Sequence, residues 1–151
     1  MYKRILVPVD GSKTSGEAFD AALQLAKESA SQVQAVHVVD TLIGIGAAGE
    51  FGGYPADLLD LLREDGKRLL AEAQEKAKAA GVEVETALVD DFGPRLGEAV
   101  ADAAKRWKAD LIVIGTHGRR GIGRVLLGSG AEQIIRLAPV PVLVVRGKTH
   151  D

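Results

Sequence analysis

DLIVIGTHGRRGIGRVLLGSG, residues 110–130, joins an apolar run to a loop rich in glycine. The run Asp110–Ile114 has the continuous apolar character of a strand that is buried on both faces of a sheet. The glycines from Gly115 to Gly130 let the backbone reach positive φ and come close to a ligand. A helix over about 129–137 follows. The stretch therefore predicts a strand, a ligand-facing loop and a helix, in that order.

The same alternation of strand and helix extends through the rest of the chain. Apolar runs predict further strands over Lys3–Val9, Gln32–Val39, Val82–Val89 and Pro141–Arg146. Helical periodicity predicts helices over 13–30, from Pro55 to Ala80, where Gly81 ends the helix, and from Pro94 to about Trp107. This alternation is typical of crossover units, which build a parallel sheet with helices on both faces.

The predicted fold class is α/β, a single three-layer doubly wound domain over residues 1–151 with a five-stranded parallel sheet. The strand order 3-2-1-4-5 fits the pattern. The third strand alternates apolar and acidic residues from Val82 to Glu85, so one of its faces is wet and we place it at an edge. The first, fourth and fifth strands are continuously apolar, and we expect them to be buried on both faces.

Composition excludes several classes of function. The chain has no cysteine, which excludes disulfides, thiolate catalysis and cysteine-based metal sites. Its formal net charge of −2 gives no electrostatic match to nucleic acid or an anionic membrane. No apolar run approaches the roughly 20 residues of a membrane span, and the first residues are too short an apolar run for a signal peptide. We therefore expect a cytoplasmic protein that binds neither nucleic acid nor membrane.

The predicted sheet places the glycine loop where such folds bind ligands. In a doubly wound sheet, ligands bind beyond the carboxyl ends of the strands where the winding reverses. That point lies between the first strand, which ends at Asp10, and the fourth, which ends at Gly115. Loop amides can converge on an anion there, and the last helix offers free N–H groups at its start. Ser129 either caps that helix or donates its hydroxyl to a phosphate. The loop therefore predicts a polyphosphate site.

The glycine spacing also carries a family resemblance. Gly115-x-x-Gly118, nine residues, then Gly128-Ser129 resembles the ATP-binding branch of the universal stress protein family. The resemblance covers nearly the whole chain, including KRILVPVDGS at the start, AVHVVD in the second strand and PVPVLVVR at the end. It implies ATP as the ligand, with Mg²⁺, or alternatively Mn²⁺, bridging phosphate oxygens near Asp10. It assigns no catalytic residue and no dedicated metal ligand.

The resemblance further implies a role for each matching residue. Pro8, Val9 and Asp10 line the base and ribose side, and the backbone of Val38 reaches the adenine edge. The ribose and phosphates lie along Gly115, Thr116, His117, Gly118, Arg119, Arg120 and Gly121, and the terminal phosphates bind at Gly128, Ser129 and Gly130. Gly130 departs from the family, which often has a β-branched residue there. We expect this glycine to weaken the first helical turn and loosen the grip on phosphate.

Several of these residues also admit a purely structural interpretation. Asp10 at a strand end could cap a turn. The sequence places no partner for His117, so we expect it to contact ribose or solvent rather than act as a general base. His37 in the second strand is expected to make a packing or polar core contact. Arg119 and Arg120, together with Arg124, either neutralise phosphates or form a solvated rim.

Other nucleotide-site patterns in the chain do not fit their context. Gly44 to Gly49 spells the dinucleotide fingerprint but follows the second strand and opens no helix. Asp91-Phe92-Gly93 lacks the rest of the kinase set, and Gly147-Lys148-Thr149 lacks the first P-loop glycine. A flavodoxin would place its phosphate loop after the first strand, where Asp10-Gly11-Ser12 is too short. A receiver domain would give Asp10 an acidic neighbour.

The fifth strand predicts self-association. No charged residue precedes Arg146 in this strand, which consists of the apolar residues Val142, Leu143, Val144 and Val145. An exposed apolar edge strand without charged side chains pairs readily with another strand. We expect it to pair with its own copy across a two-fold axis, giving a homodimer. The family resemblance implies the same.

Two functions remain open from the sequence. The first is an ATP-binding regulatory protein of the stress response, in which nucleotide switches the homodimer surface offered to protein partners that the sequence does not identify. The second is a slow Mg²⁺-dependent ATPase, or a phosphate- or adenylate-transferring enzyme, using Asp10, the metal and Ser129. Because the sequence places no general base, we favour the first.

Overall fold

The computed structural model describes residues 2–39, 56–90, 95–116 and 128–147, and all statements below concern these ranges. Their strands are β1 (Arg4–Pro8), β2 (Gln32–Val38), β3 (Val84–Val89), β4 (Leu111–Thr116) and β5 (Val142–Arg146). Their helices are α1 (Lys13–Ser29), α3 (Ala56–Ala79), α4 (Leu96–Trp107) and α5 (Ser129–Leu137). Strands and helices alternate as the sequence predicts.

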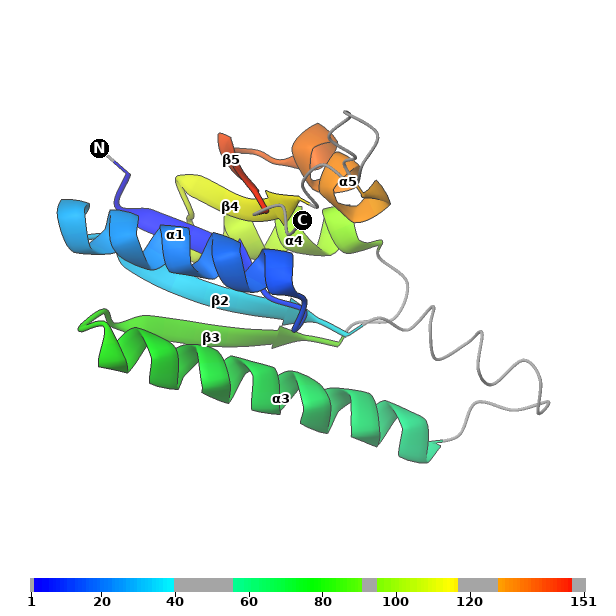
Figure 1. Ribbon diagram of the computed structural model, residues 1–151. Helices are drawn as coiled ribbons and strands as arrows, with labels where there is room; N and C mark the ends of the chain where they lie inside the picture. Colours follow the sequence, from blue (N-terminus) through cyan, green and yellow to red (C-terminus); the bar gives the residue numbers. More distant parts are fainter. Residues whose placement is uncertain (1, 40–55, 91–94, 117–127, 148–151) are drawn as a thin grey trace.

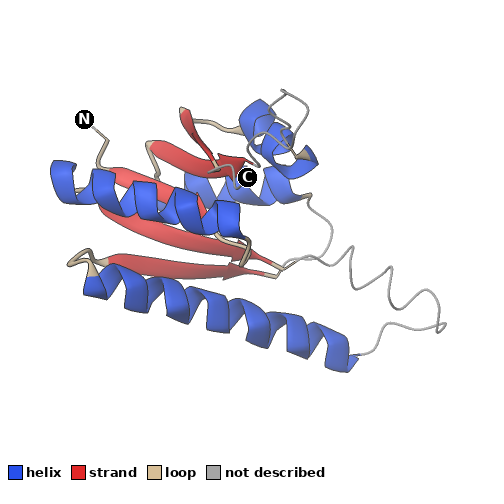
Figure 2. Cartoon of the chain, in the orientation of Figure 1, coloured by secondary structure: helices blue, strands red, loops and turns tan. Residues whose placement is uncertain are grey.

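All five strands form one parallel sheet in the order β3-β2-β1-β4-β5, which confirms the predicted topology. Helices α1 and α3 cover one face of the sheet, and α4 and α5 cover the other (Figure 1). The three layers are also clear when the chain is coloured by secondary structure (Figure 2). The winding reverses between β1 and β4, the two neighbouring interior strands on which the predicted site depends.

The core explains why β1 and β4 are apolar at every position. Ile5 and Val7 pack into the cluster beneath α1 and α3, while Leu6 between them packs beneath α4. Ile112 and Val113 divide between the two clusters in the same way. Successive side chains of a strand point to opposite faces, so a strand with a helix layer on each side must be apolar throughout. The prediction of burial on both faces is confirmed for these two strands.

The two edge strands are less buried. The placement of β3 at an edge is confirmed, although it begins at Val84, because the amide of Val82 still bonds to Ala77 O in the turn that closes α3. The expectation that the fifth strand is buried on both faces is wrong within the single chain. Leu143 is 40% exposed and Val144 is 39% exposed, since β5 has only β4 as a described neighbour in the sheet.

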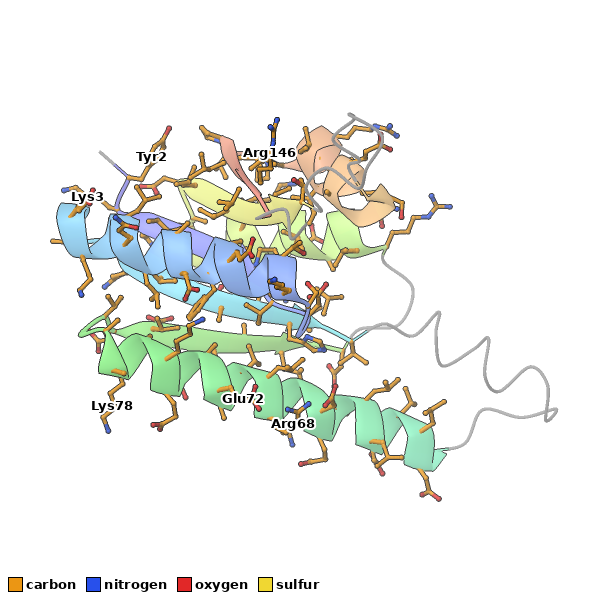
Figure 3. The ribbon with its side chains drawn as sticks, in the orientation of Figure 1. Tyr2, Lys3, Arg68, Glu72, Lys78 and Arg146 are labelled. Atoms are coloured by element: carbon orange, nitrogen blue, oxygen red, sulfur yellow. The ribbon has the colours of Figure 1, made fainter. Side chains whose placement is uncertain are left out.

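Helix ends follow local sequence signals. Ser12 is the N-cap of α1, and its side chain accepts a hydrogen bond from the amide of Ser15, as expected for a serine before a helix. Gly81 has a φ of +76° two residues after α3 ends, a conformation that favours glycine. Figure 3 shows Arg68, Glu72 and Lys78 on the side of α3 that faces away from the sheet. None of the described helices is both long and apolar enough to cross a bilayer.

Candidate functional site

The carboxyl ends of β1 and β4 lie at the same edge of the sheet. The two strands pair in parallel, with Ile5 opposite Leu111 and Leu6 opposite Ile112. The chain leaving β1 at Asp10 and the chain leaving β4 at Thr116 therefore emerge side by side. Helices α1, α4 and α5 each follow a strand end at this edge, so their N-termini open onto it (Figure 1). The strand ends on which the predicted site depends thus lie at the same edge of the sheet, and a ligand site between them stays a prediction.

The backbone at the tip of β1 is fixed from both sides of Val9. Its amide donates to Val36 O at 2.8 Å, and its carbonyl accepts a hydrogen bond from His37 Nδ1 at 2.7 Å. Because a carbonyl only accepts, Nδ1 of His37 carries the proton. The polar contact expected of His37 is therefore present, and it holds the residue next to Asp10. Val9 itself is buried, whereas Pro8 is half-buried.

Asp10 is exposed and forms a tight turn with the start of α1. Its Oδ1 accepts a hydrogen bond from the amide of Ser12 at 2.8 Å, and its own amide donates to Ser15 Oγ at 3.3 Å. Neighbouring protein atoms partly desolvate the carboxylate and so raise the pKa of Asp10, but the hydrogen bonds from Ser12 and Ser15 and the charge of His37 outweigh this effect and lower the pKa below 3.8. The turn-capping role is thus present, and the carboxylate stays ionised at neutral pH.

The lowered pKa makes a prediction for Asp10→Asn. An acid whose pKa is depressed in the folded state stabilises the protein above its unfolded pKa, and that stabilisation is lost as the pH falls through the folded pKa. Wild type should therefore be more stable than Asp10→Asn at neutral pH, and the difference should shrink below the ordinary value of 3.8. Urea unfolding of both proteins over a pH series measures this. A difference that stays constant into acid contradicts the assignment.

Val38 is the last residue of β2 and lies beyond the end of the β1 pairing. The register ends with Pro8 opposite Val36, whose carbonyl faces β1 and accepts from Val9. Backbone groups of alternate residues in a strand face the same neighbour, so those of Val38 face the space past β1. Val39 faces the other way and donates to Val89 O at 2.8 Å. The position of Val38 is compatible with the role implied by the family resemblance.

Gly115 and Thr116 face opposite sides of the sheet. A Cβ placed on Gly115 would lie 2.2 Å from the carbonyl oxygen of Thr14, so the first turn of α1 packs directly on this glycine. Thr116, the next residue, points toward the α4 and α5 layer because side chains alternate along a strand. It is only 2% exposed, and in the described part of the chain its Oγ1 has no hydrogen-bond partner. Buried hydroxyl groups in proteins nearly always have a hydrogen-bond partner, so we expect a polar group outside the described residues, or a ligand, to bond to this one.

The start of α5 differs from one expectation. Gly128 is the N-cap and Ser129 the first helical residue, so the idea that Ser129 caps this helix is wrong. The φ of −63° and ψ of 160° at Gly128 place it, not Ser129, in the extended conformation that an N-cap requires. Glu132 is the first residue whose amide bonds within the helix, to Gly128 O at 3.0 Å. The amides of residues 129–131 therefore have no acceptor within the helix.

The loop between β4 and α5 carries the remaining predicted site residues. His117, Gly118, Arg119, Arg120 and Gly121 lie outside the described residues, and their roles stay predictions. Within the described ranges, no group of three or more histidine and acidic side chains is arranged to hold a metal ion.

Sequence reasoning missed two side chains that shape the site, Ser15 and Gln133, and it did not identify the partner of a third, His37. Ser15 bonds to the Asp10 amide, His37 holds Val9, and Gln133 on α5 accepts a hydrogen bond from the amide of Gly97 on α4 at 3.2 Å. The helix-start pattern around Ser12 could have suggested Ser15. The other two contacts join residues far apart in the chain, and no local pattern in one sequence signals them.

Comparison with known proteins identifies the family. Residues 1–146 match the universal stress protein family. A universal stress protein of Methanocaldococcus jannaschii is 41% identical over 151 aligned residues, covering 97% of this chain and 83% of that protein.

Two solved structures of the family resemble the fold described above. The universal stress protein from Archaeoglobus fulgidus in complex with dAMP has a TM-score of 0.69 and 27% identity, covering 95% of this chain and 98% of the other. A universal stress protein in complex with cAMP has a TM-score of 0.65 and 27% identity, covering 97% and 98%. With its glycine spacing, its strand order and these relatives, the chain belongs to the universal stress protein family.

Proposed function

We propose that this chain binds ATP at the carboxyl edge between β1 and β4 and acts as a regulatory protein of the stress response. Relatives of this fold have been solved with dAMP and with cAMP, both adenine nucleotides. The glycine spacing after β4, which ends at Gly128-Ser129, supplies backbone amides for phosphates beyond the first. Together these features favour an adenine nucleotide with a polyphosphate chain.

One observation carries the proposal, namely the start of α5, where the N-cap residue Gly128 has no side chain that could accept from the amides that follow. Gly128 has no side-chain capping bond, and no described atom lies within 4 Å of where its Cβ would be. The amides of residues 129–131, which have no acceptor within the helix, and the positive end of the helix dipole favour a phosphate group there. The unpaired hydroxyl of buried Thr116, at the end of β4, adds a polar group that the described protein leaves unsatisfied. These residues fit a phosphate chain.

The β1 side of the same edge fits the nucleoside. We assign Pro8, Val9 and Asp10, with the backbone of Val38, to the base and ribose. His37 keeps Val9 in place, and the Ser12 turn keeps the Asp10 carboxylate in place. Bound Mg²⁺, or Mn²⁺, would neutralise phosphate charge between the two sides. Asp10 is the described carboxylate at the tip of β1, and we place the ion near it.

Nucleotide binding at the start of α5 would change the surface next to β5, the strand at the proposed dimer interface. Only residues 138–141 separate the end of this helix from β5, the strand that we propose pairs with a second copy. A ligand that orders the first turn of α5 would therefore bias the surface next to the dimer edge. A ligand shifts such an equilibrium only by its difference in affinity for the two states. The proposed mechanism is binding-linked switching.

An enzymatic alternative, slow ATP hydrolysis or group transfer using Asp10, is less well supported. The lowered pKa of Asp10 makes its carboxylate a weak base, because general bases work best when their pKa lies near the working pH. Turnover with Mg²⁺ should therefore stay well below the usual enzyme range of about 1 to 1,000 per second. A rate within that range that is lost in Asp10→Ala would favour the enzyme.

The resident ligand can be identified directly. Purified protein is denatured, and the released small molecules are separated and identified by mass spectrometry. The proposal predicts ATP, or the ADP that remains after its loss of phosphate. Release of a flavin, or failure of nucleotide-free protein to bind added ATP, would overturn it.

The proposed dimer makes a prediction for β5. Val144→Lys places a charge on the apolar edge, which should oppose strand pairing and give a monomer. Sedimentation velocity at micromolar concentration measures the change. Leu61→Lys is the matched control, because Leu61 is 66% exposed but lies on α3, away from β5. A wild-type protein that sediments as a monomer at high concentration would contradict the dimer.

A further inference from the structure

The contact between α4 and α5 contains two glycines in unusually close packing. A Cβ on Gly97 of α4 would lie 2.6 Å from Gln133 Cβ and 2.7 Å from the backbone carbon of Gln133 on α5. A Cβ on Gly130 of α5 would lie 2.7 Å from Leu96 Cδ2 on α4. Real Cβ atoms do not approach neighbours this closely, and at Gly97 the neighbour includes backbone that cannot turn aside. The first turn of α4 and the second turn of α5 are therefore held at a distance that only glycine at position 97 allows.

A hydrogen bond across the same contact fixes how α5 is oriented relative to α4. Arg95, the N-cap of α4, makes no side-chain capping bond. Instead Gln133 Oε1 accepts the amide hydrogen of Gly97 at 3.2 Å, so a side chain of α5 caps α4. Distance and orientation of α5 relative to α4 are thus set by the pair Gly97 and Gln133.

Helix α5 has few other anchors. Ile134 is its one buried residue, while Ile135 and Leu137 are 41% and 43% exposed. A short helix with a single buried side chain responds strongly to a change in its main contact. Because the amides of residues 129–131 begin this helix, a shift of α5 moves them directly.

We propose that Gly97 and Gln133 are positioning residues for the phosphate end of the nucleotide site. The inference rests on the proposed function, since it assigns the terminal phosphates to the start of α5 and the nucleoside to β1 and β2. Gly97 and Gln133 touch no nucleotide in this account. They place the α5 amides where the β- and γ-phosphates bind, so their loss weakens ATP more than AMP. The same contact explains the departure at Gly130, where Leu96 of α4 covers the position that a β-branched residue would fill.

The test compares ATP and AMP dissociation constants by calorimetry, using nucleotide-free protein with Mg²⁺. Gly97→Ala should raise the ATP dissociation constant about tenfold and change the AMP constant less than about twofold. The ratio of the AMP constant to the ATP constant, called the ratio below, therefore falls. Gln133→Leu removes the capping bond without adding bulk at the helix contact. It should lower the ratio about threefold. If Gly97→Ala does not fold, this variant still tests the proposal.

Two controls separate positioning from general destabilisation. Gly66→Ala also overpacks, since its Cβ would lie 2.6 Å from His37 Cδ2, but it lies on α3, on the opposite face of the sheet. It should affect both nucleotides alike and leave the ratio unchanged. Gly16→Ala on α1, with no described atom within 4 Å, should change neither constant.

The outcomes distinguish the inference from the function on which it rests. If wild type binds ATP but Gly97→Ala and Gln133→Leu keep the wild-type ratio, the positioning role is overturned and the proposed function stands. If wild type binds neither nucleotide, the proposed function fails, and the positioning role fails with it. A lower ratio in both variants, with an unchanged ratio in Gly66→Ala, establishes the positioning role.

Discussion

Replacing Gly128 with valine will abolish ATP binding and leave the fold intact. No described atom lies within 4 Å of a Cβ at this position, and its φ of −63° suits any residue, so the substitution causes no internal clash. The branched side chain would instead stand at the start of α5, where we place the terminal phosphates. We expect ATP affinity to fall at least about 100-fold, equivalent to about 2.7 kcal/mol.

The stability of Gly128→Val should change little. Glycine is a better N-cap than valine, so the helix start loses about 1 kcal/mol. Calorimetric titration with ATP and thermal unfolding of the same sample separate the two effects. Gly128→Ala serves as the graded control, with a smaller side chain and a smaller loss of affinity. Unaltered ATP binding by Gly128→Val would show that the phosphates lie elsewhere.

Replacing Gly115 with alanine will destabilise the whole domain. The added Cβ would lie 2.2 Å from Thr14 O and 2.7 Å from Thr14 C, and both are backbone atoms. Relief requires α1 to move away from β4, and overpacking of this kind costs about 1–3 kcal/mol. For a domain of this size, about 3 kcal/mol lowers the melting temperature by roughly 6–12 °C.

Thermal unfolding followed by circular dichroism measures the Gly115 effect. Gly16→Ala, in the first turns of α1, is the matched control, because no described atom lies within 4 Å of its Cβ. It should stabilise the protein by about 0.5–1 kcal/mol, since alanine is the better helix former. A Gly115→Ala protein that melts at the wild-type temperature would refute the close approach of Thr14.

The contrast between Gly115 and Gly128 shows what the sequence could predict at the site. Both belong to the spacing that the sequence singled out, and the pattern alone offers one reason for both, close approach to a ligand. In the structure Gly115 is required by the backbone of Thr14, whereas Gly128 faces open space among the described atoms. The packing partner of Gly115 comes from the first helix, which no local window around β4 contains.

The fold was largely predictable because its signals are local and repeated. Apolar runs at Arg4–Pro8 and Leu111–Thr116 mark strands with a helix layer on each side, and the acidic alternation near Glu85 marks an edge. Boundaries were less accurate. The cap of α5 differs by one residue, since Gly128 and Ser129 are both acceptable N-caps by type and only the backbone conformation decides between them.

The contacts that position the site were not predictable. Gly97 and Gln133, or Val9 and His37, meet only after the chain has folded, and each pair joins separate elements. Their residue types are compatible with many environments. Such contacts depend on how helices and strands pack, and a single sequence carries no periodic or spacing signal for them.

The proposed binding of ATP depends most directly on the amides at the start of α5. Amide NMR spectra of ¹⁵N-labelled protein, recorded while Mg²⁺-ATP is added, report on each of them separately. We predict large shifts for Ser129, Gly130 and Ala131 with ATP and much smaller ones with AMP, while Val9 and Asp10 shift with both. If ATP binds without shifting the NMR signals of these three amides, the phosphates are not held at this helix, and the proposed site is wrong.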